Sequence, residues 1–324
     1  MVEKEIIKLD LRDRKILFEL DFRAREPNSG IARKVGLSKQ GVDYRIRRLQ
    51  EKGVIEGFYP VINIIKLGYV YGRILLKFQN VNREKEREIF SALISDTQFR
   101  WIVSAEGNYD LGVAVWAKRL TDLKNVSGQL LERFGQFIRE KRESVGIRVT
   151  HFQGRYLIGA AAAREVSVEE GSSAGIDEVD VKILRALCKN ARMPLVELAK
   201  NAVVSPKVAA YRLRRLESEG VILGYRPSIN HNLLGFTHYK ILFYLSNVTK
   251  LELRRFHARL RQLPEVLYIV EEIGICDVDI EVMLPSAQSL FSFIDQIKFD
   301  FPTLIRDYQI LILKKTLKID YLPF

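Results

Sequence analysis

Two short segments of the chain gather side chains that can bind a phosphate backbone and the edges of bases. Guanidinium groups bind phosphate and guanine in a bidentate way, and hydroxyl, amide and ammonium groups add further contacts. The residues of this kind are Ser38, Lys39, Gln40, Asp43, Tyr44, Arg45, Arg47 and Arg48 in the first segment, and Ser205, Lys207, Tyr211, Arg212, Arg214 and Arg215 in the second. We therefore expect both segments to contact nucleic acid.

Each segment has the period of a helix with one buried stripe. Val42, Ile46 and Leu49 recur at the spacing of one helix face, and the polar residues lie on the other side. The residues expected nearest to DNA are Lys39, Gln40, Asp43, Tyr44 and Arg47, and in the second segment Lys207, Tyr211 and Arg214. Arg45 and Arg48 flank this face. A competing interpretation is that one arginine of each helix pairs with an acid such as Glu51 or Glu217 and does not reach DNA.

A Gly-x-x-Asp pattern occurs twice, each time between two apolar segments. The first copy is Gly107-Asn108-Tyr109-Asp110, and the second runs from Gly274 to Asp277 through Ile275 and Cys276. Plain hairpin chemistry explains glycine and aspartate at such a turn. The second copy lacks a polar residue at position 275, so the two turns are not equivalent.

Acidic residues cluster in one strand of the second half of the chain. Residues 278–282 alternate, so Asp279 and Glu281 share one face, with Glu271 and Glu272 on the neighbouring strand. We expect this acidic half to pair with the more basic first half, which gives a pseudo-dimer within one chain. Two other interpretations stay open, namely binding of a cationic effector such as lysine or arginine, and a solvated acidic face.

The whole chain repeats itself with a constant offset of 167 residues. Residues 38–63 and 205–230 are identical at 13 of 26 aligned positions, and no gap is needed. The repeat unit covers 9–157 and then 176–324. A repeat of this length is a tandem pair of domains and not a short solenoid repeat.

Each unit opens with a predicted three-helix domain. Asp10 and Asp177 stand where they can cap the first helix, Pro27 suits the start of a second helix over about 28–35, and Ser38 caps a third that runs to about Lys52. A tight turn before a basic third helix is typical of a helix-turn-helix domain. The second unit has Val203 where the first has Gly36, so its turn lacks the residue that most easily adopts a left-handed conformation.

The rest of each unit alternates strands and helices. In the first unit we expect strands over 69–78, 101–106, 111–116 and 145–157, with helices over 82–94 and 123–137. The order β-α-β-β-α-β is that of a ferredoxin-like domain, whose bare sheet face is most simply covered by another such sheet. The fold class is therefore α+β, with two copies of a winged helix-turn-helix domain followed by a ferredoxin-like domain. The domains are 1–60 and 61–157, a linker over 158–175 that we expect to be flexible coil, and then 176–228 and 229–324.

Composition narrows the class of protein. The net charge is +12. Residues 1–60 carry 14 lysines and arginines against 10 acids, and residues 176–230 carry 10 against 6, so the two helix-turn-helix segments are electrostatic equals. The charged N-terminal segment and the absence of a long apolar run predict a cytoplasmic protein with no membrane span. Cys188 and Cys276 fall at unmatched positions of the repeat and four histidines show no ligand spacing, which predicts no disulfide, metal or cofactor.

The arrangement resembles the Lrp/AsnC (feast/famine) family of regulators. The motifs that carry the resemblance are Leu9-Asp10, then Ala32-x-x-Val35-Gly36-Leu37-Ser38, Val42-x-x-Arg45-Ile46-x-Arg48-Leu49, Gly53-Val54-Ile55 and Gly107-Asn108-Tyr109-Asp110-Leu111. The resemblance covers both units, and family members usually carry one. It implies transcription regulation on double-stranded DNA, dimers made by sheet packing and assembly of those dimers. It also implies an amino-acid effector near Gly107, Asn108, Tyr109 and Asp110, and near Gly274 and Asp277.

Two alternatives to a sequence-specific regulator remain at this stage. The sirohaem decarboxylases resemble the same family, also as two-unit fusions, but they carry a His-Asn-Tyr-Arg-type stretch on the strand before the turn. Here the corresponding residues are 99–102 and 267–270, and neither contains histidine, so we expect no enzymatic activity. The other alternative is an architectural protein that wraps DNA with little choice of sequence.

Overall fold

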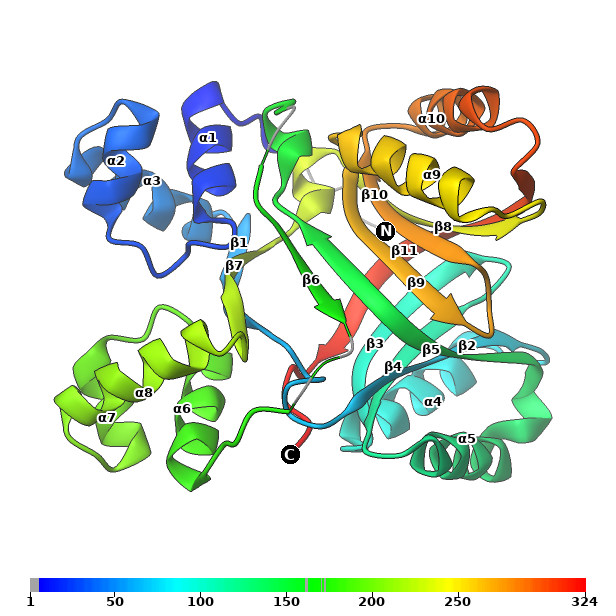
Figure 1. Ribbon diagram of the computed structural model, residues 1–324, viewed down its shortest axis with the longest axis horizontal. Helices are drawn as coiled ribbons and strands as arrows, with labels where there is room; N and C mark the ends of the chain where they lie inside the picture. The colour runs from blue at the N-terminus through cyan, green and yellow to red at the C-terminus, as the bar shows by residue number, and fades with distance from the viewer. Residues whose placement is uncertain (1–5, 161–162, 170, 172) are drawn as a thin grey trace.

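The computed structural model describes residues 6–160, 163–169, 171 and 173–324. Two three-helix domains lie side by side at one end of the molecule, and a closed sheet with a helix pair on each outer side forms the other end (Figure 1). The helices of the first domain are α1 (Leu11–Leu20), α2 (Asn28–Val35) and α3 (Lys39–Glu51), and those of the second are α6 (Glu178–Lys189), α7 (Leu195–Ala202) and α8 (Pro206–Ser218). Within the described part of the chain, no helix has the length and apolar character needed to cross a membrane.

The helices begin where the capping residues predict. The Asp10 carboxylate accepts a hydrogen bond from the backbone N–H of Asp13 at 2.7 Å, and Ser38 Oγ accepts from the N–H of Gly41 at 3.1 Å. In the second unit, Asp177 and Ser205 cap α6 and α8 in the same way. These bonds satisfy N–H groups that a helix leaves free in its first turn.

The turn of the second helix-turn-helix domain keeps the geometry of the first despite its different residue. Gly36 ends α2 with φ 66° and ψ 45°, and Val203 ends α7 with φ 59° and ψ 47°. A β-branched residue in this left-handed region is strained, because its Cβ lies close to the following carbonyl oxygen. Val203 therefore adopts the left-handed conformation that Gly36 adopts in the first unit, and the two turns have the same geometry.

The two helix-turn-helix domains are joined into one body. Strand β1 (Ile55–Ile62) pairs antiparallel with β7 (Ile222–Ile229), so each domain gives one strand to a shared two-stranded ribbon. The apolar residues of both domains form one continuous core, which includes Leu17 of the first unit and Leu184 of the second. The third helices of the two domains, α3 and α8, therefore stand on one shared support.

Each unit then folds as the predicted β-α-β-β-α-β module. The first has β2 (Val70–Phe78), α4 (Arg83–Ser95), β3 (Phe99–Gly107), β4 (Leu111–Ala117), α5 (Leu120–Phe134) and β5 (Ile138–Phe152). The second has β8 (Thr237–Leu245), α9 (Lys250–Gln262), β9 (Val266–Ile273), β10 (Val278–Leu284), α10 (Ala287–Asp300) and β11 (Ile305–Ile319). Short 3-10 turns occur as η1 (Gly135–Phe137), η2 (Arg155–Leu157) and η3 (His231–Leu234).

The sheets of the two modules are also hydrogen-bonded to each other along both edges. The long strand β5 pairs with β2 of its own module and with β9 of the other, while β11 pairs with β8 and with β3. The ring order is β2-β4-β3-β11-β8-β10-β9-β5 and back to β2, so the sheet is closed (Figure 1). The expected face-to-face partner sheet is present within the same chain, and both edges are joined as well.

The linker is not coil along its whole length, so that expectation is corrected. Residues Glu165–Glu169 form β6, which pairs antiparallel with β5 from Arg148 to Phe152. An alternating stretch beside an open strand edge finds backbone partners there, and the small residues around it hid this strand in the sequence.

Candidate nucleic-acid interface

The recognition helices α3 and α8 present matched side chains to solvent. Tyr44 and Tyr211 occupy equivalent positions, and each residue is 60% exposed. Arg47 and Arg214 are also equivalent and exposed, and each donates from Nε to the carbonyl four residues earlier in its helix, at 3.4 and 3.3 Å. The remaining predicted contacts that lie exposed are Ser38, Lys39, Gln40, Ser205 and Lys207. Each helix therefore presents to solvent a polar face that includes a tyrosine, an arginine and a lysine.

The flanking arginines of the first helix are held by the first helix of their own domain. Arg45 Nη1 lies 2.8 Å from Asp10 Oδ2 and 2.7 Å from Asp13 Oδ1, and Arg48 Nη2 lies 2.6 Å from Asp13 Oδ2. Asp13 is buried. Hydrogen bonds from the backbone of Asp13 and from Arg45 hold the pKa of Asp10 below its ordinary value, against a smaller effect of burial. These bonds clamp α3 to α1.

The second unit repeats this clamp. Arg212 Nη1 lies 2.6 Å from Asp177 Oδ2, and Arg215 Nη2 lies 2.5 Å from Asp180 Oδ2. The interpretation that an arginine pairs with an acid fits both helices, but the acid differs from the one expected. It comes from the first helix of the domain and not from Glu51 or Glu217. Arg45, Arg48, Arg212 and Arg215 thus position the recognition helices, and their contact with DNA stays a prediction.

Asp43 has a partner that the sequence did not suggest. The amide of Asn28 donates to the Asp43 carboxylate, and Arg192 Nη2 donates to Asn28 Oδ1 at 2.6 Å. Arg192 belongs to the second unit and also lies over the ring of Phe58, 5.1 Å from its centroid. The carboxylate at the surface of α3 is therefore tied to the other helix-turn-helix domain, and the second unit has Ala210 at the matching position.

Both Gly-x-x-Asp turns have structural partners. Asp110 Oδ2 accepts from the N–H of Phe78 at 2.8 Å, and Asp277 Oδ2 accepts from the N–H of Leu245 at 2.7 Å. Gly107 and Gly274 have φ values of 126° and 128°, and a Cβ would lie 2.5 Å from the Ile310 oxygen or 2.2 Å from the Glu143 oxygen. The glycines allow the backbones of the two modules to approach, and the aspartates close the ends of β2 and β8. Tyr109 is buried and Asn108 is exposed. These contacts account for the pattern, and effector binding by Gly107, Asn108, Tyr109, Asp110, Gly274 and Asp277 stays a prediction.

The acidic strand faces the inside of the closed sheet and meets cations there. Arg73 Nη1 lies 2.5 Å from Asp279 Oδ2, and Arg73 also pairs with Glu272. Lys240 Nζ lies 2.9 Å from both Asp279 Oδ1 and Glu281 Oε1. Asp279 is fully buried, so the interpretation as a solvated face is wrong. The expected pairing of the acidic module with a cation of the first module is confirmed by the Arg73 contacts.

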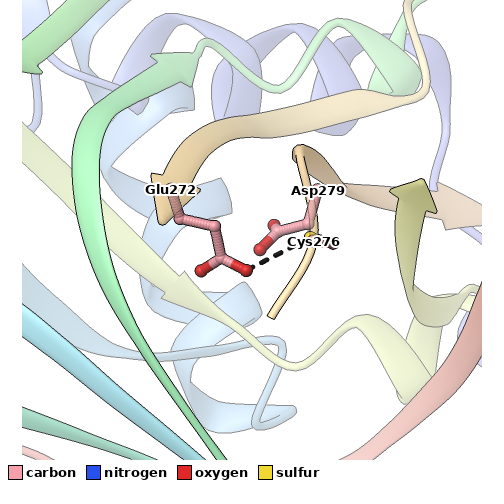
Figure 2. A group of neighbouring side chains, drawn as sticks. All are labelled: Glu272, Cys276 and Asp279. Atoms are coloured by element: carbon pink, nitrogen blue, oxygen red, sulfur yellow. Dashed lines mark hydrogen bonds between the residues drawn. The ribbon is translucent and has the colours of Figure 1, made fainter. Parts of the chain in front are cut away.

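The same carboxylates form a three-donor group with Cys276. Figure 2 shows Glu272 and Asp279 pointing toward each other, with a hydrogen bond from the Cys276 thiol to Glu272 at 3.1 Å. Among the described residues, only this group brings three such donor atoms within 4.8 Å of one another. Arg73 and Lys240 already neutralise the two carboxylates, and burial raises the pKa of the Cys276 thiol. A protonated thiol beside carboxylates that are paired with two cations does not suit a metal ion, so the group is an ion-pair cluster.

The pKa values of two carboxylates in this cluster shift in opposite directions. Burial raises the pKa of Asp279, and the attraction of Arg73 and Lys240 only partly opposes that rise. Although burial alone would raise the pKa of Glu272, Arg73, Ser144 and Cys276 hold it below the ordinary value. Two cations and three carboxylates share the interior, and His238 Nε2 lies 2.9 Å from Glu281 Oε2.

The histidines His151, His231 and His238 lie beside other aromatic rings. The ring of His231 lies 6.4 Å from that of His238 and 5.7 Å from that of Tyr156, and the ring of His151 lies 5.0 Å from that of Tyr268. Burial lowers the pKa of His151 and of His231 to about 3, so both rings are neutral at pH 7. The sequence gave no signal for the contact of His151 with Tyr268, because the two residues belong to different units and only the fold brings them together.

A buried ion pair between the two units was also missed. Arg226 of β7 binds Asp21, which follows α1, with Nε to Oδ1 at 2.5 Å and Nη2 to Oδ2 at 2.9 Å. Arg226 also donates to the carbonyl of Phe152 at 3.1 Å. A comparison of the two units could have suggested this ion pair. Arg226 is matched by Tyr59, and Asp21 is matched by Cys188, so each charge occurs in only one unit.

Comparison with known proteins bears on both ends of the molecule. A winged helix-turn-helix DNA-binding family model matches residues 9–56 and 176–222. The HTH-type transcriptional regulator LrpA of Pyrococcus horikoshii is 33% identical over 118 residues, which cover 36% of this chain and 82% of that regulator. A proline dehydrogenase transcriptional activator of Rhodobacter capsulatus is 39% identical over 92 residues, which cover 28% of this chain and 60% of that protein.

A solved structure matches the two units together. The crystal structure of the siroheme decarboxylase NirDL in co-complex with an iron-uroporphyrin III analogue aligns with a TM-score of 0.62 over 97% of this chain and 94% of that one. The sequence identity is 15%, so the likeness is one of fold.

Proposed function

Because the chain belongs to the Lrp/AsnC family of helix-turn-helix regulators, we propose that it is a sequence-specific DNA-binding transcription regulator that uses two recognition helices of one chain. The observation that carries the proposal is the matched exposure of Tyr44 with Arg47 on α3 and of Tyr211 with Arg214 on α8. Both helices stand on the single body made by the β1–β7 ribbon and its shared core.

The exposed faces suit the major groove of a DNA duplex. In helix-turn-helix proteins the N-terminal part of the recognition helix contacts base edges, while basic side chains hold the phosphates. Here the polar residues begin at the capping serines Ser38 and Ser205. Since Gln40 and Asp43 are matched by Lys207 and Ala210, the two helices read different sequences. The operator is therefore asymmetric, with half-sites about one helical turn apart or a multiple of it.

An amino acid or a related small molecule is the effector that we propose, acting in the cytoplasm on an assembly of several chains. The support for this part is the family, together with the position of both Gly-x-x-Asp turns where the two modules meet. Such a ligand would act by binding one arrangement of the two modules more tightly than another. The difference between these two affinities limits how far it can change DNA affinity through the β1–β7 ribbon.

Selection of bound fragments from the native genome at near-physiological salt tests the proposal. Wild type is expected to enrich a few promoters, and a mixture of the twenty amino acids is expected to change that enrichment. Arg47→Ala and Arg214→Ala should each weaken DNA binding. The control Arg139→Ala removes an exposed arginine of β5 and should leave binding unchanged. Uniform weak binding with a steep dependence on salt would instead favour an architectural protein.

We also propose that the chain is not an enzyme. The support is the absence of histidine from the segments Phe99–Ile102 and Leu267–Val270, on β3 and β9. Titration with sirohaem followed by absorbance tests this directly. We expect an unchanged spectrum. A spectral shift together with decarboxylated product would contradict this proposal and would indicate a decarboxylase that acts on a tetrapyrrole.

A further inference from the structure

The buried cluster inside the closed sheet is distributed unequally between the two modules. Arg73 on β2 and Lys240 on β8 occupy equivalent positions of the repeat, so each module supplies one cation. All the carboxylates come from the second module. Where it has Glu272, Asp279 and Glu281, the first module has the uncharged residues Ala105, Gly112 and Ala114.

The contacts of Arg73 cross between the modules. Arg73 reaches Glu272 and Asp279, and Ser144 Oγ of β5 donates to Glu272 Oε2 at 2.6 Å. Arg73, Glu272 and Asp279 have side chains that are at most 2% exposed. Such groups cost free energy when they are buried without a partner of opposite charge. Arg73 therefore needs a facing module that carries carboxylates.

The ion pair between Asp21 and Arg226 follows the same rule. Asp21 belongs to the first unit and Arg226 to the second, and both are buried. At the equivalent positions of the repeat, the chain has Cys188 and Tyr59, and Tyr59 stacks on Tyr321 with ring centroids 4.7 Å apart. This ion pair too forms only when a first unit faces a second unit.

We infer that these two sets of buried charges are a pairing code, which lets each first unit associate only with a second unit. Pairing of two second units would bury six carboxylates with two lysines at the cluster positions, and would leave each Arg226 without its aspartate. Pairing of two first units would bury two Arg73 side chains with no carboxylate at these positions. Like pairs are disfavoured by unpaired buried charge, and mixed pairs are not.

The code has a consequence for copies of this chain and for one-unit relatives. A family member with a single unit cannot replace either half unless it carries the matching charges, so the chain stays insulated from such partners. Every molecule then carries one α3 and one α8. The inference does not depend on DNA binding, because it concerns only which units associate.

Refolding of cleaved protein tests the code. A protease site inserted after Gly171 allows the folded chain to be cut between its units, and the two halves stay together until they are unfolded in urea. After refolding of the equimolar halves, native mass spectrometry counts first–first, first–second and second–second pairs. We expect only the mixed pair from the wild-type sequence.

Neutral variants remove the code without leaving new buried charges. Arg73→Met with Glu272→Gln and Asp279→Asn removes the charges that cross between the modules, and like pairs are expected to appear. Adding Asp21→Asn and Arg226→Met should bring like pairs toward half of the assembled protein, the share given by random association. Arg148→Gln with Glu271→Gln is the matched control. It removes a partly exposed ion pair that also joins the units, at 3.1 Å, and should leave only mixed pairs.

Two results would overturn the inference. One is a substantial share of like pairs from the wild-type sequence, a result that does not depend on whether any variant folds. The other is exclusive mixed pairing by the fully neutral variant with native circular dichroism, which would assign the specificity to shape.

Discussion

Substitution of Val203 by glycine should stabilise the second helix-turn-helix domain. Val203 has φ 59° and ψ 47°, and the residue is 79% exposed, so it gains little from burial. The left-handed conformation costs an L-residue about 1–2 kcal/mol, and glycine loses roughly 0.5–1 kcal/mol more backbone entropy on folding. The difference predicts a net gain of roughly 0.5–1 kcal/mol, or about a two- to fivefold change in the folded-to-unfolded ratio.

Urea unfolding followed by far-UV circular dichroism measures this gain, and hydrogen exchange of the α8 amides locates it. Gly36→Val is the mirror-image control. A Cβ at Gly36 meets no atom within 4 Å, so any loss of stability there comes from backbone strain and not from a clash. We expect opposite shifts of the unfolding midpoint for the two variants. An unchanged or lower midpoint for Val203→Gly would refute the argument from strain.

Three further substitutions or conditions have defined outcomes. Gly274→Ala should destabilise the protein by about 2–3 kcal/mol in urea unfolding, because the new Cβ would lie 2.2 Å from the carbonyl oxygen of Glu143. His151 and His231 have pKa values of about 3, below the ordinary 6.5, so the unfolded state binds more protons and stability should fall as the pH drops from 6.5 toward 3. The loss by pH 5 is at most about 2 kcal/mol for each ring, and a His151→Phe variant should show a correspondingly flatter dependence of unfolding free energy on pH. Asp13→Asn should lower the free energy of unfolding by about 1–3 kcal/mol, because two arginine hydrogen bonds lose a charged acceptor; an unchanged value would show that the clamp of α3 does not contribute.

Local signals in the sequence were enough for the three helices of each helix-turn-helix domain and for the order of elements in each ferredoxin-like module, but they did not reveal β1, β7 or β6. Asp10 and Ser38 cap helices because a short acceptor stands just before an apolar helical period, and both caps are present. The alternation over residues 278–282 placed Asp279 and Glu281 on one face, and the structure agrees. These features depend on neighbours within a few residues, which a single sequence displays.

Contacts between distant segments could not be read in this way. The closing pairs β5–β9 and β3–β11 join strands of different units, and the periodicity of a strand does not name its neighbour. The acid partners of Arg45 and Arg48 come from α1 for the same reason. The valine in the turn shows a further limit, since the domain adopts a strained conformation that residue preference alone argues against.

Footprinting of one chain on a selected operator tests the central claim most directly. Hydroxyl-radical cleavage should show two protected patches of different sequence, about one helical turn apart or a multiple of it. Arg47→Ala should weaken one patch and Arg214→Ala the other, while Arg139→Ala leaves both unchanged. A single patch that only one of the two substitutions affects would contradict the claim that one chain uses both recognition helices, and uniform protection would contradict sequence-specific binding.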